Sequence, residues 1–237
     1  MKNYSKQQCR LLRITLLLGF ILSIYGVSPA SAANDPLISQ VSVALSLPAN
    51  PIRGKALFNR NCIACHALHA YGDPFKAVPS LAGQHFSYLV RQIAYFSDGE
   101  RKNSGVHWAL DRNTIQSPQS WADVAAYLSN LPMMRFAQTG GSRNIDIGRT
   151  IFNQQCASCH HADASGNADG TVPALRDQHF SYLSYRLHAL AQDKRHEVDP
   201  GLMRIIQTLN NREIGSLANY LSHLKGPSRR VAQNSST

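Results

Sequence analysis

The sequence predicts an all-α protein built from two tandem copies of one module. The motif C-x-x-C-H occurs twice, at residues 62–66 and 156–160. The residues around the two motifs repeat at a constant offset of 94, and a fixed offset across whole units indicates a duplicated module. Apolar residues recur every three or four positions between the motifs, and no alternating strand pattern competes with that helical spacing.

The repeat covers most of the chain. GKALFN at 54–59 returns as GRTIFN at 148–153, and VPSL at 78–81 returns as VPAL at 172–175. QHFSYL at 84–89 returns unchanged at 178–183, and the offset becomes 93 near the end of each copy. Each copy is therefore expected to form one domain. The expected division is 1–32 for a leader, 33–135 and 143–225 for the two domains, 136–142 for a linker and 226–237 for a flexible tail.

Three helices are expected in each domain. One leads into the motif, one follows the loop after it, and one closes the domain. The expected ranges are 52–61, 86–96 and 121–131 in the first domain, and 145–155, 180–191 and 213–224 in the second.

The first 32 residues have the pattern of a cleavable secretory signal. Four basic residues come first, an apolar run over 14–25 follows, and small residues occupy 30–32. The alternative is an uncleaved anchor, but the run is shorter than the roughly 20 residues that a spanning helix needs. We therefore expect cleavage near Ala32, export to the periplasm and a soluble mature protein.

The positive charge does not indicate a nucleic-acid partner. The formal charge of +10 falls to +6 when the four basic residues of the leader are removed. No basic stripe interleaved with aromatic residues is present, and the remaining arginines are scattered. Of the five cysteines, Cys9 leaves with the leader, and the C-x-x-C-H motifs contain the other four.

The C-x-x-C-H motif predicts a covalently bound haem in each domain. Cys62 and Cys65 lie on one face of a helical turn, so both thiols can form thioethers along one haem edge, and His66 can supply an axial imidazole. Cys156, Cys159 and His160 repeat the arrangement. A zinc site or a pair of disulfides would also use C-x-x-C pairs, but neither explains the histidine after both pairs.

With these motifs the chain resembles the class I c-type cytochromes, and its tandem form resembles the cytochrome c4 family. The resemblance implies two domains, each a few short helices wrapped around one covalent haem. It implies that the carbonyl groups of Pro79 and Pro173 hold the proximal imidazoles. It also implies that the first and last helices of each domain pack together through six residues: Gly54, Phe58, Tyr127, Gly148, Phe152 and Tyr220.

The resemblance also implies a methionine on the far side of each haem, and the two halves differ there. Met203 lies where this ligand belongs in the second half. Ala109 or Leu110 stands opposite it in the first half, depending on the alignment, and neither can bind iron. His107 is the nearest good ligand and would give bis-histidine iron.

Other occupants of the first distal position remain open. The iron could be open or bound by water with His107 at the surface, the chain just before the linker could fold back and supply Met133 or Met134, and Lys102 is a remote candidate. His85 and His179 repeat in both halves, including the half that contains Met203. They are therefore expected to pack or to lie at the surface rather than to bind iron.

The expected function is the transfer of single electrons between redox proteins, such as a dehydrogenase or cytochrome complex and a terminal oxidase or reductase. Contact with a membrane would come only through such a partner. Ligation by a methionine thioether raises a haem's potential, so with Met203 on the second haem and His107 on the first, electrons would enter at the first haem and leave from the second. The alternative is a haem enzyme, or an enzyme's electron-transfer subunit, with chemistry at the first haem. A peroxidase, a thiosulfate dehydrogenase and a sulfide dehydrogenase are examples. Thiosulfate dehydrogenases use a distal cysteine, and this chain has none to spare.

Overall fold

The computed structural model describes residues 35–101, 106, 110, 114–134, 136–168, 171–192 and 199–226. The chain divides into two units, Met1–Ser39 and Gln40–Thr237, and the second unit contains both repeats. The predicted leader, residues 1–32, lies outside the described residues. The first described element is α2 (Pro36–Ser46), in which Asp35 Oδ1 accepts a hydrogen bond from the N–H of Leu37 at 2.8 Å.

All regular structure in the described ranges is helical, which confirms the predicted all-α class. The first module contains α3 (Pro51–Asn61), α4 (Ile63–His66), the 3-10 turn η2 (Pro74–Lys76), α5 (Phe86–Asp98) and α7 (Pro118–Asn130). The second contains α8 (Ile145–Ile151), the π-helical turn η3 (Phe152–Cys156), α9 (Ala157–His160), α10 (Phe180–Ala191), α11 (Pro200–Gln207) and α12 (Asn211–His223). None of the helices in these ranges is both long and apolar enough to cross a bilayer.

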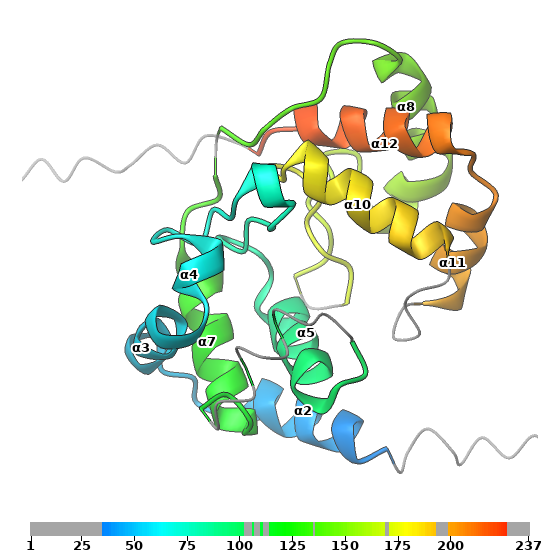
Figure 1. Ribbon diagram of the computed structural model, residues 1–237. Helices are drawn as coiled ribbons and strands as arrows, with labels where there is room; N and C mark the ends of the chain where they lie inside the picture. Colours follow the sequence, from blue (N-terminus) through cyan, green and yellow to red (C-terminus); the bar gives the residue numbers. More distant parts are fainter. Residues whose placement is uncertain are drawn as a thin grey trace, which may run out of the picture. The chain divides into compact units, whose positions relative to one another are not determined.

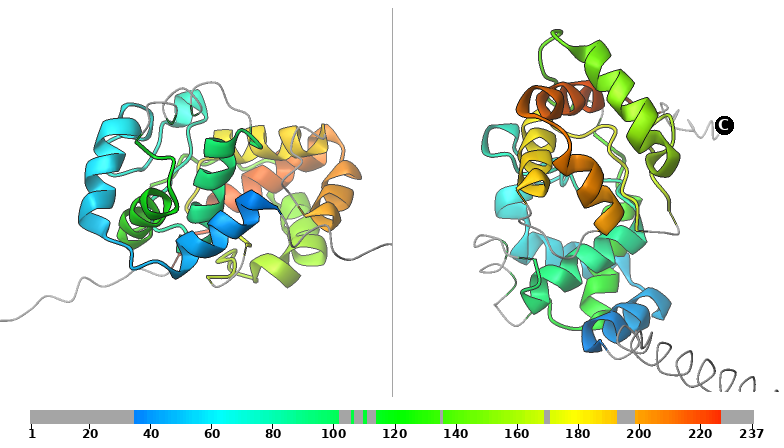
Figure 2. Two further views of the ribbon diagram at one scale, coloured as in Figure 1. Left: turned by 90° about the horizontal axis from the view of Figure 1, so that it is seen from below. Right: turned by 90° about the vertical axis from the view of Figure 1, so that its right-hand side faces the viewer.

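In each module the first helix packs on the last, α3 on α7 and α8 on α12 (Figures 1 and 2). Glycine makes this approach possible. A Cβ on Gly54 would lie 1.9 Å from the carbonyl oxygen of Asp123, and one on Gly148 would lie 2.0 Å from that of Ser216. These two carbonyl groups belong to the last helices, so both crossings exclude a side chain at the glycine.

Aromatic pairs complete the two crossings. The ring centroids of Phe58 and Tyr127 are 5.5 Å apart, and those of Phe152 and Tyr220 are 5.6 Å apart. Both phenylalanines are fully buried. The predicted packing roles of the glycines and aromatic residues are therefore correct.

Local capping explains where the closing helices begin. The Ser117 side chain accepts from the N–H of Ser120, whose hydroxyl accepts from the N–H of Ser117. Asn210 and Glu213 form the same reciprocal pair of hydrogen bonds, called a capping box, at the start of α12. Each box satisfies backbone donors that a helix N-terminus otherwise leaves unpaired. The expected closing helices are thus present in both modules.

Three features depart from the expected helices. The expected helix 145–155 is α-helical only to Ile151 and continues as a π-helical turn to Cys156. Neither α2 nor α11 was expected, although both begin with an aspartate followed by proline. In α11 the Asp199 side chain accepts hydrogen bonds from Gly201 and Leu202, at 2.7 and 3.1 Å. This capping compensates for the short length of that helix.

Candidate functional sites

Each C-x-x-C-H histidine is the last residue of a short helix and points its Nδ1 at a proline carbonyl. In the first module Nδ1 of His66, at the end of α4, lies 3.0 Å from the carbonyl oxygen of Pro79. In the second, Nδ1 of His160 lies 3.1 Å from that of Pro173. A carbonyl oxygen only accepts, so Nδ1 carries the proton in both rings. The lone pair of Nε2 is then available to bind a metal.

The loop after each motif turns through left-handed backbone to make this contact. Ala67 and His161 have φ of 61° and 63°, directly after the motif histidines. Further on, the N–H of Gly72 bonds to the carbonyl of His66, and that of Gly166 bonds to the carbonyl of His160. A Cβ on Gly72 would lie 2.5 Å from the carbonyl oxygen of Pro79, and one on Gly166 would lie 2.4 Å from that of Pro173. Only glycine lets the loop lie this close to the proline carbonyl.

Burial keeps both histidines neutral. It lowers the pKa of His66 and of His160, and the bonds to Pro79 and Pro173 oppose the shift only in part. A neutral imidazole with a fixed tautomer is the form that ligates iron. The sites therefore present the ligand in its binding state.

The motif thiols fit covalent haem attachment better than zinc binding. All four are free, and burial raises the pKa of Cys62 to about 12 and that of Cys156 to about 11. Structural zinc takes four protein ligands. Nowhere in the described ranges do three His, Cys, Asp or Glu side chains gather as a metal site. The buried Nε of Arg91, which has no hydrogen-bond partner among the described residues, suits an anion such as a haem propionate.

The distal positions are described in the second module and only partly in the first. Met203 is buried in α11, 8% exposed, in a cluster with Leu190 and Ile206. Leu110, which the offset of 93 pairs with Met203, is 6% exposed. The other candidate, His107, lies outside the described residues, as do Lys102 and Ala109.

Of the two methionines just before the linker, Met133 lies on the first module. Met134 is buried. The side chain of Met133 lies against Gly83, on the loop that follows Pro79, so that a Cβ on this glycine would be 2.4 Å from Cγ of Met133. The structure therefore places Met133 beside the loop of the proximal histidine.

A second set of repeated residues joins the two modules. Gln84 bonds through its side-chain amide to both backbone groups of Ala174, and Gln178 bonds in the same way to both backbone groups of Ser80. The histidines that follow these glutamines also contact the opposite module. Nε2 of His85 lies 2.7 Å from the carbonyl oxygen of Ser165, and Nε2 of His179 lies 2.8 Å from that of Tyr71.

This interface was missed at the level of sequence. The two histidines were expected to pack or to lie at the surface, and no role was assigned to the glutamines. The available signal was the QHFSYL hexapeptide, which is identical in both copies. Identical polar residues in a diverged repeat indicate a shared contact, which here is the contact between the copies.

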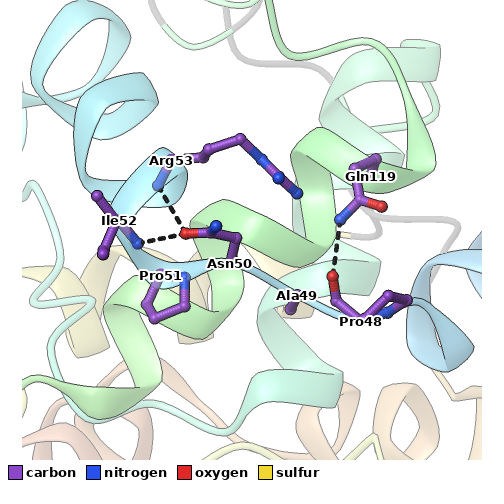
Figure 3. A pocket seen from close by; sticks show the side chains of 7 residues that line it. All are labelled: Pro48, Ala49, Asn50, Pro51, Ile52, Arg53 and Gln119. Carbon is purple, nitrogen blue, oxygen red and sulfur yellow. Dashed lines mark hydrogen bonds between the residues drawn. The ribbon is translucent and has the colours of Figure 1, made fainter.

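One surface hollow has a structural explanation. It is lined by residues 48–53 and Gln119, at the start of α3 (Figure 3). Oδ1 of Asn50 accepts from the N–H groups of Ile52 and Arg53, and Nε2 of Gln119 donates to the carbonyl of Pro48 at 3.2 Å. These bonds cap the helix and tie it to α7, and none involves the haem motifs.

The comparisons with known proteins agree with this geometry. The family model of cytochrome c matches residues 52–132 and 145–225, one match for each repeat. Cytochrome c4 of Pseudomonas aeruginosa is 26% identical over 88% of this chain and 98% of its own length. A thiosulfate dehydrogenase electron acceptor of Stutzerimonas stutzeri is 25% identical over 80% of this chain and 94% of its own.

Solved structures agree as well. The crystal structure of reduced recombinant cytochrome c4 from Pseudomonas stutzeri superposes with a TM-score of 0.65 at 26% identity, covering 74% of this chain and 99% of the other. Two family matches and two equivalent proximal sites lead to one conclusion: the chain belongs to the cytochrome c family, as a di-haem cytochrome c4-like electron-transfer protein that carries two c-type haems.

Proposed function

We propose that this chain is a periplasmic carrier that takes single electrons from a dehydrogenase or cytochrome complex and delivers them to a terminal oxidase or reductase. The secretory pattern of the first 32 residues supports the location. The similarity to a thiosulfate dehydrogenase electron acceptor supports a dehydrogenase as donor. When bound, each haem supplies an iron that gains or loses one electron.

The residues that hold the haems follow from the motifs. Cys62, Cys65, Cys156 and Cys159 form the thioethers, and His66 and His160 are the proximal ligands. Pro79 and Pro173 fix the orientation of these imidazoles through the Nδ1 contacts of 3.0 and 3.1 Å. A carbonyl that accepts from Nδ1 also raises the donor strength of Nε2.

The distal ligands make the two haems unequal. Met203 is the distal ligand of the second haem, supported by its burial in α11 at the position that the family uses. His107 is the distal ligand of the first. Thioether ligation favours the reduced state, so the second haem has the higher potential. Electrons therefore enter at the first module and leave from the second.

The observation that carries this proposal is that, in both modules, a proline carbonyl accepts a hydrogen bond from Nδ1 of the proximal histidine. Two low-spin sites with fixed ligands reorganise little on reduction, which suits rapid transfer. Partners would meet the protein through small, transient interfaces.

The test is a spectroelectrochemical titration of the holoprotein. Two separate one-electron steps are expected, and the methionine-linked absorption of the ferric state should follow the higher one. Two equal potentials would contradict the proposed direction.

The alternative is chemistry at an open first haem. Binding of carbon monoxide distinguishes such an enzyme from an electron carrier. A carrier with two six-coordinate haems should bind little carbon monoxide when reduced. A high-spin first haem that binds the gas at once would favour an enzyme or an enzyme subunit.

A further inference from the structure

The peptide group after each loop proline is hydrogen-bonded on both of its sides. The carbonyl of the Pro79–Ser80 peptide accepts from Nδ1 of His66, and its N–H donates to Oε1 of Gln178 at 2.9 Å. The Pro173–Ala174 peptide repeats this between His160 and Gln84, with a distance of 3.0 Å to the glutamine oxygen. Each proximal histidine is therefore one peptide away from a side chain of the other module.

The orientation of the glutamine amides is determined by their partners. Nε2 of Gln178 donates to the carbonyl of Ser80 at 2.9 Å, while its oxygen accepts from the N–H of the same residue. A flipped amide would set donor against donor and acceptor against acceptor. The oxygen therefore faces the peptide N–H in both modules.

Water does not substitute for these bonds, because the groups are buried. Gln84 and Gln178 are 9% and 7% exposed, and the residues that they bind, Ser80 and Ala174, are 7% and 4% exposed. In such surroundings hydrogen bonds in a chain polarise one another. An N–H that donates makes the carbonyl of the same peptide a stronger acceptor.

We propose that Gln84 and Gln178 are reciprocal positioning residues, each of which tunes the proximal imidazole, and hence the haem potential, of the opposite module. The oxygen of Gln178 strengthens the Pro79 carbonyl as an acceptor, which strengthens His66 as a donor to iron and lowers the potential of the first haem. Gln84 does the same for His160 and the second haem. The potentials thus depend on the docking of the modules.

The experiment replaces one glutamine and follows both haems. In the holoprotein, Gln178→Leu removes the acceptor for the Ser80 N–H, so the potential of the first haem should rise by more than that of the second. Gln84→Leu should raise the potential of the second haem more than that of the first. Assigned haem-methyl resonances measured by NMR during a redox titration distinguish the two haems.

A second substitution separates tuning from mere docking. Gln178→Glu keeps an acceptor for the Ser80 N–H but cannot donate to the Ser80 carbonyl. It should lower the potential of the first haem, opposite in sign to Gln178→Leu. If the glutamine only holds the modules together, both variants weaken docking and shift the potential in the same direction, which would overturn the inference even if the modules separate.

The matched control is Ser87→Ala. The Ser87 hydroxyl donates across the same interface to the carbonyl of Ala168 at 2.9 Å, away from both proline peptides. Its loss should leave the difference between the two potentials unchanged. A shift as large as that of Gln178→Leu would also contradict the inference.

The inference depends on His66 and His160 being the proximal ligands, as in the proposed function, but the two fail separately. Equal potentials in the unsubstituted protein would contradict the direction of electron flow and leave the glutamine test intact. If each variant shifted the potential of the haem in its own module rather than that of the opposite module, only the role of the glutamines would be contradicted.

Discussion

The two modules are alike where they meet and at the helix crossing, and unlike at the distal positions and at individual positions of the last helix. Both use the same glutamine and histidine at the interface and the same proline carbonyl behind the proximal histidine. Elsewhere the copies diverge at individual positions. The last helix of the first module carries Asp123 where that of the second carries Ser216. Met203 has the non-ligating Leu110 as its counterpart.

This difference shows which constraints the duplication retained. A reciprocal contact constrains both copies at once, because a change in either glutamine leaves the buried peptide groups of the other module unpaired. Met203 packs within its own module and Asp123 bonds within its own, so each copy could change such residues alone. The shared contact keeps the copies docked, and under the proposed function the separate changes make the haems unequal.

The largest expected effect tests the helix crossing that the modules share. Gly54→Ala and Gly148→Ala each place a Cβ about 2 Å from a carbonyl oxygen of the last helix, and backbone cannot move away cheaply. Each should lower the free energy of unfolding of its module by about 3 kcal/mol or more. Denaturant unfolding followed by the haem absorption measures this loss.

The control for the crossing is Gly215→Ala, in α12. A Cβ at this glycine meets nothing within 4 Å. Since alanine forms helices better than glycine, this change should stabilise the second module by up to about 1 kcal/mol. If Gly54→Ala were tolerated and Gly148→Ala were not, the two crossings would not be equivalent.

The next effect concerns the distal positions, where the modules differ. Met203→Leu conserves volume, so it should cost less than about 1.5 kcal/mol of stability. It should nevertheless remove the methionine-linked absorption, lower the higher potential and let the second haem bind carbon monoxide. Potentiometry and absorption spectra measure these changes.

Leu110→Met is the matched change at the paired position of the first module. It should leave the methionine-linked absorption of the second haem unaltered. An unchanged spectrum in Met203→Leu would show that Met203 is a core residue and not a ligand.

The sequence predicts well those structural features whose residues recur at a fixed spacing. The spacing of apolar residues predicts α3, α5, α7, α10 and α12, and the motif with its resemblance to known cytochromes predicts the haems. The glycines and aromatic residues of the crossings were also predicted correctly. These features depend on residue type at a fixed separation, which a sequence displays directly.

The remaining features depend on contacts that a sequence does not display. The bonds of Gln84 and Gln178 go to backbone groups 90 and 98 residues away, and a backbone acceptor has no characteristic residue type. The start of α2 was marked by Asp35 and Pro36, but its β-branched residues weaken the helical pattern. The π-helical turn before Cys156 departs from a continuous helix without a proline or glycine in the segment.

The last expected effect is an acid-sensitive difference at Asp123. Burial alone would raise the pKa of this carboxyl, but hydrogen bonds from Arg53, Asn50 and Gln119 overcome it and lower the pKa. Nε of Arg53 and the N–H of Asn50 both lie 2.7 Å from the carboxylate. A lowered pKa in the folded state means that the stabilisation is present at neutral pH and is lost as pH falls through the folded pKa, below about 4.

The first module should therefore weaken in acid before the second, where Ser216 carries no charge. Asp123→Asn should cost on the order of 2 kcal/mol at neutral pH, as expected for hydrogen bonds to a charged group, and almost nothing in acid. Ser216→Ala, the matched change, should show no such pH dependence. Thermal unfolding from neutral pH to pH 3, followed at each haem, measures the difference. Equal acid sensitivity of the two modules would mean that the Asp123 cluster does not distinguish their stabilities.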